Sequence, residues 1–514
     1  MKTHLLTGQL TASGDACYAA MKARDARFDG CFFTGVTSTG VYCRPVCSVK
    51  APKRENCRFF SHAAQAESAG FRPCLRCRPE LAPHSVVWSI QDASYILAHQ
   101  AARLLDEPER WLETTPSVEK LALKLGISAR HLRRIFEAQF GVSPLQYLQT
   151  RRLHTAKQLL ADTALPITQV ALLSGFASLR RFNATFVGHY KLNPTQLRRA
   201  APQAQGSGQG NTVRLGYRPP YDVAAMLTFM RKHHIHNVEF TLESIADDPD
   251  KYGNSRTFGI EIAGTKYTGW LHTRFDEPRA QLVLTVSDSL REVLPLVIRR
   301  VRAAFDLDAD PRAINAALHA AFPGGDGLRV PGALDGFELA VRAVLGQQIT
   351  VAAARTLAQR LVDKLGDAIV TPWPALNRLF PSPAVLAEAS SDTLGQLGIV
   401  RQRQAAIVGL ARAVASGSLQ LHGGADVPAT VVALKALPGI GDWTAQYIAM
   451  RALRWPDAFP AGDVALHKAL GVQGLKNPAR LAEAMSLAWQ PWRSYAVIRL
   501  WSGAWQAPEL GALE

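Results

Sequence analysis

Cysteine is absent from most of this chain. All seven cysteines lie at or before position 77, and residues 78–514 contain none. Disulfides and thiol chemistry are therefore excluded from that long segment. An odd number of cysteines crowded into one short segment favours metal binding or thiol chemistry there over a disulfide framework.

Long apolar runs are also missing. No stretch approaches the ~18 consecutive apolar residues expected of a membrane-spanning helix, although the apolar fraction of 47% is typical of globular proteins. The N-terminal segment MKTHLLTGQLTASGD lacks the apolar run of a signal peptide. We therefore expect a cytoplasmic protein with no membrane partner.

Basic residues are concentrated in the N-terminal part of the chain. The net charge is +16, and residues 1–202 contain 27 Lys and Arg against 14 Asp and Glu, whereas residues 203–514 contain 31 against 28. A positive field attracts a polyanion such as DNA, because neutralised phosphates release condensed counterions. A positive charge that only keeps the protein soluble explains the composition equally well. The sequence motifs are needed to distinguish this explanation from DNA binding.

The chain is too long for one hydrophobic core, and its composition changes along its length. We expect a multidomain, mainly α fold with small α+β parts. The predicted order is a Cys-, Arg- and Gly-rich module at 1–83, short helices at 84–200, a polar linker at 201–212, a small antiparallel sheet at 213–288 and a helical domain at 289–514.

Four cysteines have the spacing of a metal site. Cys43-x3-Cys47 is followed after 26 residues by Cys74-x2-Cys77. Two such pairs can converge on one tetrahedral Zn²⁺ with four sulfur ligands, and a purely structural zinc ribbon has the same spacing. Four thiolates give the site a formal charge of −2, so one of them can remain nucleophilic toward an electrophilic methyl group.

The strings around these cysteines resemble a known repair family. FFTGVTSTGVYCRPVC and GFRPCLRC are similar to the amino-terminal domain of the Ada methyl-phosphotriester repair proteins, over about residues 15–80. The resemblance implies that Cys43 irreversibly takes a methyl group from a DNA phosphotriester, with Cys47, Cys74 and Cys77 as the fixed ligands. Methylation would remove about one negative charge and so ease the approach to DNA phosphates. Some Ada proteins repair O6-methylguanine with a further cysteine, and the absence of cysteine downstream excludes that chemistry here.

Two segments further along share one pattern. They read A-x3-G-I-S, ending at Ser128, and A-x3-G-F-A-S, ending at Ser178. In each, a small residue lets two helices approach, glycine makes the tight turn, and serine caps a second helix with a basic outer face. One such hairpin alone is common, and charged faces are usually just solvated.

The pair resembles the tandem helix-turn-helix domain of AraC-type transcription activators, over about residues 115–200. The resemblance implies that the second helix of each unit enters a major groove of promoter DNA, and that RNA polymerase is a partner. The side chains expected to contact DNA are Arg133, Arg134, Arg180 and Asn183.

The C-terminal part contains a glycine-rich hairpin followed by an acidic residue. LPGIG at 437–441 lies between two helical runs, and its bare backbone amides can approach a DNA phosphate. Alone, it is only a nonspecific DNA-binding element or a helix connection. Together with Asp463 in the loop FPAGD, it resembles the helix-hairpin-helix base-excision glycosylases. GQQI at 346–349 and WRSY at 492–495 are similar to the AlkA methylpurine branch, over about residues 213–508.

This second resemblance implies a chemistry. Breaking an N-glycosidic bond passes through an oxocarbenium-like state, which a carboxylate stabilises while it positions or activates water. That role falls to Asp463. Trp443 stands where lyase-active relatives have a nucleophilic lysine, so we expect base removal without strand cleavage. The expected substrates are alkylated bases such as 3-methyladenine and 7-methylguanine in double-stranded DNA.

A flipped base must be held by stacking. Trp443, Tyr447 and Trp501 fall where the AlkA branch lines its pocket, and electron-rich rings suit positively charged alkylpurines. Without the resemblance, three aromatic residues in helices would be core residues. Gln348 stands where the best-known AlkA member inserts an apolar wedge, and Ser502 where it has an aromatic, so the substrate range is open. The expected DNA contacts in this half are Gln348, Pro438, Gly439 and Gly441.

Three functions stay open at this point. The first is a monomeric, nucleoid-associated repair enzyme and regulator, a glycosylase of the DNA-3-methyladenine II type that also carries a stoichiometric methylphosphotriester-DNA methyltransferase domain. The second is a damage-sensing transcription regulator whose glycosylase-like domain only binds DNA. The third is a structural zinc protein that binds nucleic acid. The presence of Asp463 and the three aromatic residues favours the first.

Overall fold

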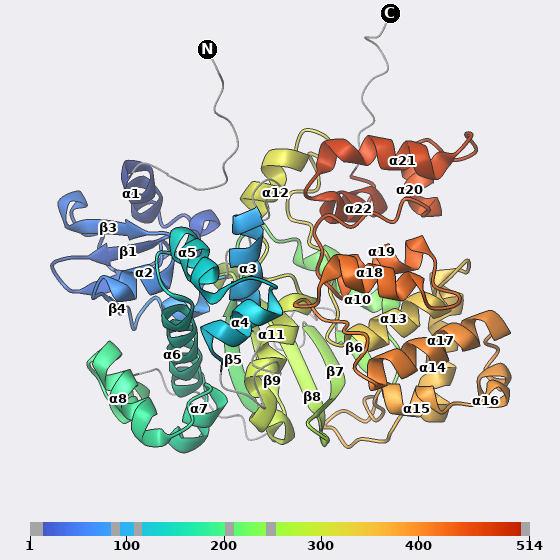
Figure 1. The fold of residues 1–514 in the computed structure, drawn as a ribbon, viewed down its shortest axis with the longest axis horizontal. Coiled ribbons are helices and arrows are strands. Elements are labelled where there is room, and N and C mark those ends of the chain that lie inside the picture. The colour runs from blue at the N-terminus through green and yellow to red at the C-terminus, as the bar shows by residue number, and fades with distance from the viewer. Residues whose placement is uncertain (1–13, 84–92, 107–115, 201–209, 243–252, 505–514) are drawn as a thin grey trace, which may run out of the picture.

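The computed structural model describes residues 14–83, 93–106, 116–200, 210–242 and 253–504 (Figure 1). These residues form a cysteine module, a helix-turn-helix region, an antiparallel sheet and a C-terminal helical region, which confirms the predicted multidomain, mainly helical fold class. Among the helices in these ranges, none is long and apolar enough to cross a membrane.

The cysteine module contains a four-stranded sheet flanked by α1 (Gly14–Lys22) and α2 (Ala63–Ser68). Its strand order is β3-β1-β2-β4, and only β2 and β4 run parallel. Because β2 ends at Cys43 and β4 ends just before Cys74, the parallel pair brings one cysteine of each close pair to the same end of the sheet. The strands are β1 (Phe33–Val36), β2 (Val41–Cys43), β3 (Cys57–Phe60) and β4 (Arg72–Pro73).

The described residues of the helix-turn-helix region, 93–106 and 116–200, form seven helices. Gly126 and Gly175 adopt φ values of 68° and 80°, as their tight turns require. Ser128 and Ser178 accept hydrogen bonds from backbone N–H groups three residues ahead, which confirms the predicted serine caps. The helices are α3 (Ala93–Asp106), α4 (Val118–Lys124), α5 (Ala129–Phe140), α6 (Pro144–Asp162), α7 (Ile167–Leu173), α8 (Leu179–Tyr190) and α9 (Pro194–Ala200).

The sheet is five-stranded, antiparallel and ordered β5-β9-β8-β7-β6, as the alternating sequence pattern predicts. Two details differ from the prediction. Helix α10 (Val223–His233) interrupts the strands, and β5 begins at Asn211, inside the predicted linker, whose residues 201–209 lie outside the described ranges. The strands are β5 (Asn211–Gly216), β6 (Glu239–Leu242), β7 (Gly253–Ile262), β8 (Thr265–Asp276) and β9 (Gln281–Val286).

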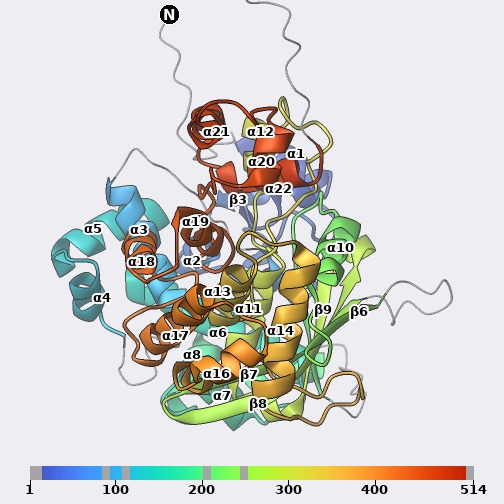
Figure 2. The same cartoon turned by 90° about the vertical axis from the view of Figure 1, so that its right-hand side faces the viewer.

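The C-terminal region is helical, and the LPGIG hairpin connects α18 to α19 (Figure 2). Most of its buried apolar residues outside α11 form one large hydrophobic core. The helices are α11 (Leu294–Ala304), α12 (Pro311–Leu318), α13 (Gly336–Leu345), α14 (Val351–Leu365), α15 (Pro383–Ala387), α16 (Ser391–Gln396), α17 (Arg401–Ala415), α18 (Val427–Lys435), α19 (Asp442–Arg451), α20 (Val464–Ala469), α21 (Pro478–Ser486) and α22 (Arg493–Trp501).

The modules share cores and buried contacts. Leu159 of α6 and Phe182 of α8 belong to the same buried cluster as Leu284 of β9 and Val297 of α11. The second helix-turn-helix unit and the sheet are therefore one packed body, although the sequence predicts a linker between them. The unexpectedly long α6 runs beside the cysteine module in both views (Figures 1 and 2).

Buried polar groups hold the cysteine module against α6. The Lys157 ammonium donates to the carbonyl oxygen of Cys74 at 3.0 Å and pairs with Glu80 at 2.6 Å. His154 Nε2 lies 3.0 Å from the Glu67 carboxylate. Burial opposes ionisation of Glu67, but the neighbouring histidines outweigh it, and the pKa of this carboxyl lies well below its usual value.

Candidate functional site

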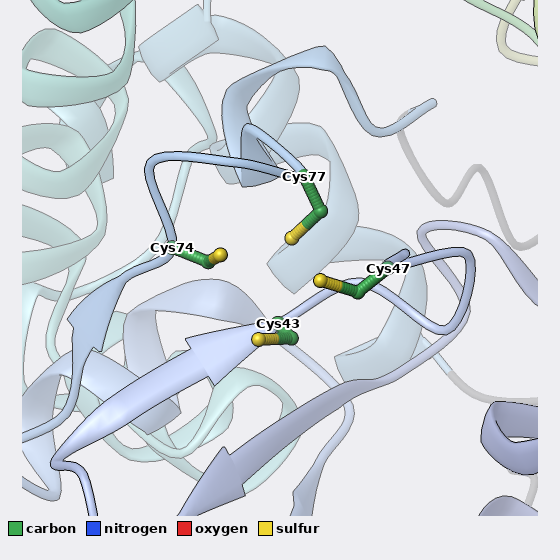
Figure 3. Close-up of side chains that lie close together, drawn as sticks. All are labelled: Cys43, Cys47, Cys74 and Cys77. Carbon is green, nitrogen blue, oxygen red and sulfur yellow. The ribbon is translucent and has the colours of Figure 1, made fainter. Parts of the chain in front are cut away.

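The four predicted cysteine ligands converge in the cysteine module. Cys43 ends β2, Cys47 lies in the loop after it, and Cys74 and Cys77 lie in the turn after β4 (Figure 3). Their sulfur atoms all lie within 4.8 Å of one another. A tetrahedral Zn²⁺ with bonds of about 2.3 Å needs sulfurs about 3.8 Å apart. The four thiols therefore fit this metal in both chemistry and spacing.

A backbone hydrogen bond also supports the cysteine cluster. Cys77 Sγ accepts the backbone N–H of Arg44 at 3.3 Å. A hydrogen bond to a thiolate stabilises it and lowers its nucleophilicity, so the Cys77 sulfur is held as a ligand.

Three donors surround the Asp463 carboxylate. Asp463 caps α20, and its Oδ1 accepts the backbone N–H of Leu466 at 2.9 Å. The indole Nε1–H of Trp443 donates to Oδ2 at 2.8 Å, and that of Trp501 to Oδ1 at 3.3 Å. Because Asp463 is partly exposed, its fixed carboxylate still faces solvent.

The three predicted pocket aromatics gather beside this carboxylate. Trp443 and Tyr447 lie one turn apart on α19 and stack with ring centroids 5.3 Å apart and planes 14° apart. Trp501 of α22 lies 6.2 Å from the Tyr447 ring. All three side chains are partly exposed, unlike ordinary core residues. The structure thus brings together an acidic group and an open aromatic surface.

Arg451 supports this surface, and the sequence reasoning missed it. Its guanidinium donates to the Tyr447 hydroxyl and lies 5.2 Å from the centre of the Tyr447 ring. Its Nε donates to the carbonyl oxygen of Pro331 at 2.7 Å. The signal available in the sequence was the i, i+4, i+8 spacing of Trp443, Tyr447 and Arg451 on one helix.

The predicted contact residues of the hairpin lie next to those of the preceding turn. Gly439 has φ of 80°, and its carbonyl oxygen accepts the Gln347 side-chain amide at 2.9 Å. Gln348 is exposed between α13 and α14 with φ of 55°, a left-handed conformation that only a supported turn holds in a non-glycine residue. Pro438 and Gly441 are exposed on the same hairpin.

The predicted contacts of the helix-turn-helix region lie on the outer faces of α5 and α8. Arg133, Arg134 and Arg180 are exposed, and Asn183 is partly exposed. Arg133 forms an ion pair with Glu119 at 2.8 Å. Because both partners are solvent-exposed, this pair is weak and leaves the arginine available to a phosphate.

Four family models match the chain in order. The metal binding domain of Ada matches residues 16–80, and a helix-turn-helix domain matches 121–200. The AlkA N-terminal domain matches 212–335, and the HhH-GPD superfamily of base excision DNA repair proteins matches 341–494. Together with the sulfur cluster, the first match identifies a Zn²⁺ site with four cysteine ligands. The other matches identify DNA as a partner and the C-terminal half as a DNA glycosylase.

Curated relatives show the same organisation. A probable bifunctional transcriptional activator/DNA repair enzyme AlkA of Mycobacterium tuberculosis (strain CDC 1551 / Oshkosh) is 37% identical over 498 residues, covering 95% of this chain and 96% of the relative. DNA-3-methyladenine glycosylase 2 of Escherichia coli (strain K12) is 32% identical over 296 residues, 57% of this chain and 99% of the relative. The bifunctional transcriptional activator/DNA repair enzyme Ada of the same strain is 35% identical over 162 residues, 32% of this chain and 42% of the relative. The chain therefore belongs to the family of AlkA-type bifunctional transcriptional activators and DNA repair enzymes, as its sequence motifs predict.

Proposed function

We propose that the chain hydrolyses the N-glycosidic bond of alkylated bases in double-stranded DNA, with Asp463 as its catalytic carboxylate. The arrangement of two indole donors on this carboxylate, beside stacked Trp443 and Tyr447, carries the proposal. Preorganised groups aimed at developing charge are usually the largest contribution to catalysis. A fixed anion beside the sugar suits a reaction whose transition state is cationic at the sugar.

The reaction follows from the positions of these groups. The base leaves with the electron pair of its glycosidic bond, and Asp463 stabilises the positive charge that develops on the sugar. Water then adds to the sugar carbon and releases one proton to the solvent. An alkylated purine such as 3-methyladenine or 7-methylguanine carries positive charge, which favours stacking on Trp443, Tyr447 and Trp501. Trp443 offers no amine for a Schiff base, so the strand stays intact.

DNA contacts support the flipped base. In the hairpin between α18 and α19, Pro438 and Gly441 are exposed and Gly439 is partly exposed, so a phosphate can approach the backbone amides of the two glycines without side-chain obstruction. Gln348 is exposed on the neighbouring turn, and we assign to it the filling of the space that the extruded base leaves in the duplex. A polar side chain packs less well between bases than an apolar one. Base flipping in this protein therefore depends more on stacking of the flipped base in the aromatic pocket.

We propose methyl transfer to Cys43 as a second function, supported by the match of residues 16–80 to the metal binding domain of Ada and by the convergence of Cys43 with the other three cysteines. The thiolate attacks the methyl carbon of a phosphotriester, a C–S bond forms, and the C–O bond breaks with its electrons on the phosphate oxygen. A zinc-bound thioether replaces a thiolate, so the site loses about one negative charge and binds DNA more readily. Mass spectrometry after incubation with methylphosphotriester DNA should find one added methyl group on Cys43 and none on the other ligands.

These activities divide along the chain. We assign methyl transfer to residues 1–83, promoter recognition to 84–200, and base excision to 213–514. In promoter recognition, α5 and α8 enter successive major grooves, and the protein acts as a nucleoid-associated monomer that contacts RNA polymerase. The proposed base contacts are Arg133, Arg134, Arg180 and Asn183.

The test of excision uses a duplex that contains one alkylated base. Single-turnover release of that base is measured for the unmodified chain, for Asp463→Asn and for Asp442→Asn. Asp442 is a matched control, because it is an exposed aspartate beside the hairpin that pairs with Lys435 at 2.8 Å. We expect only Asp463→Asn to abolish release. If no protein releases the base, the chain is a damage-sensing regulator whose glycosylase domain only binds DNA.

A further inference from the structure

A buried arginine joins the cysteine module to the glycosylase domain. Arg218 follows β5 and is fully buried. Its guanidinium donates to the carbonyl oxygens of Asp29, at 2.6 Å, and Pro83, at 3.0 Å, in the cysteine module. It also donates to the carbonyl oxygens of Asp308, at 2.9 Å, and Ala309, at 3.0 Å, before α12. One side chain therefore satisfies carbonyl groups of both modules.

From Arg218 the hydrogen bonds lead to the zinc ligands. The carboxylate of Asp29 pairs with the guanidinium of Arg44, whose Nε donates to it at 2.8 Å. Arg44 Nη1 donates to the Cys77 carbonyl oxygen at 3.1 Å, and the Arg44 backbone N–H donates to Cys77 Sγ at 3.3 Å. Both Asp29 and Arg44 are buried. A displacement of the cysteine loops therefore reaches Arg218 through contacts that water does not screen.

In the other direction the hydrogen bonds lead to the base pocket. Arg329 Nη2 donates to the carbonyl oxygen of Arg218 at 2.7 Å. Two residues further along the chain, the Pro331 carbonyl oxygen accepts the Arg451 Nε–H at 2.7 Å, and Arg451 donates to the Tyr447 hydroxyl. Arg329 and Arg451 are buried as well. The zinc site and Tyr447 are thus the two ends of one buried chain of contacts.

We propose that this chain of contacts couples the state of the zinc centre to the geometry of the base pocket, with Arg218 as the link between modules. Zn²⁺ would tie the loop after β2 to the turn after β4, because each supplies two of the four sulfurs, and removal of the metal releases this link. The loop of Arg44 and the turn of Cys77 can then shift relative to each other, and Arg218 loses its fixed partner at Asp29. Packed interiors respond by moving between discrete arrangements, so the shift reaches the Pro331 segment. If zinc changes the affinity of the base pocket for a ligand by some factor, thermodynamic linkage requires that the bound ligand change the affinity for zinc by the same factor.

Hydrogen exchange of the full chain without DNA tests the coupling. Two amides report on the Pro331 segment, those of Val330, which donates to Asp306 Oδ2 at 3.2 Å, and Gly332, which donates to the Ala304 carbonyl oxygen at 2.8 Å. Zinc removal by a chelator should speed their exchange several-fold in the unmodified chain. Unchanged exchange after complete zinc removal would overturn the proposal, and this result needs no variant.

Variants test the role of Arg218. In Arg218→Met, the two amides should already exchange fast, and zinc removal should change them no further. Arg312→Met is the matched control, since Arg312 stacks on Phe28 of the cysteine module at 4.7 Å but lies outside the chain of contacts. It should respond to zinc removal as the unmodified chain does. An Arg218 variant that keeps the full zinc response contradicts the proposal, and Arg218→Lys replaces the methionine variant if that protein does not fold.

Excision kinetics provide a second readout, which rests on the proposed function. Zinc removal should lower kcat/KM for excision in the unmodified chain and leave Arg218→Met unaffected relative to its own zinc-loaded form. If the protein excises no base but the two amides exchange faster after zinc removal, the proposed function is refuted and the coupling stands. A chain that excises bases at the same rate and with the same exchange, with and without zinc, refutes the coupling and keeps the function.

Discussion

Replacing Trp443 with phenylalanine removes the indole donor 2.8 Å from Asp463 Oδ2 and keeps an aromatic ring against Tyr447. A hydrogen bond to a charged group contributes roughly 1.5–3 kcal/mol. Since Asp463 is partly exposed, water replaces part of this bond, and the lower end of that range applies. About 1.4 kcal/mol corresponds to a tenfold change in rate. We therefore expect Trp443→Phe to lower kcat/KM for excision about tenfold.

Single-turnover excision on a duplex with one alkylated base measures this loss. Trp501→Phe is the comparison, because the Trp501 indole donates to the same carboxylate from 3.3 Å, a longer and weaker contact. Trp501→Phe should lower the excision rate clearly less than Trp443→Phe does, and both variants should remain faster than Asp463→Asn. An unchanged rate for Trp443→Phe, or the larger loss for Trp501→Phe, would refute the idea that the indole donors order the carboxylate.

Three further changes probe residues that support the base pocket, the zinc site and the helix-turn-helix region. Arg451→Met removes the donor to the Tyr447 hydroxyl, and stopped-flow base-flipping measurements should show weaker capture of the base. The melting temperature should also fall, because the Pro331 carbonyl oxygen loses its buried donor. Lys157→Met leaves the buried Glu80 with Arg78 as its remaining cation, so chemical denaturation should show a loss of about 2 kcal/mol and zinc should dissociate faster. Ser128→Ala removes the cap of α5 and should lower the unfolding free energy by about 1 kcal/mol; an unchanged value would contradict the capping role.

Local sequence patterns were sufficient to predict those features whose residues lie close together in the sequence. The two cysteine pairs form one cluster because β2 and β4 run parallel and end side by side. Gly126 and Ser128 form the turn and the cap that their residue types favour. In these cases the backbone requirement and the side-chain chemistry lie within a few residues, so periodicity and spacing reveal them.

Contacts between distant segments could not be predicted in the same way. Arg218 and Lys157 look like surface residues in sequence, since charged side chains are mostly exposed, yet both are buried by partners from other modules. The indole donors to Asp463 depend on how α19 and α22 pack, which no local pattern specifies. The predicted linker ended too late because Asn211 pairs with Val286 of β9, a contact of long sequence separation.

The most direct measurement is chromatography of the free bases that the full chain releases from methylated duplex DNA, with the strands analysed before and after alkali. We expect free 3-methyladenine and 7-methylguanine, and strands that break only after alkali, because Asp463 directs hydrolysis and no amine attacks the sugar. DNA from which no methylated base is released, or strands that break without alkali, would contradict it.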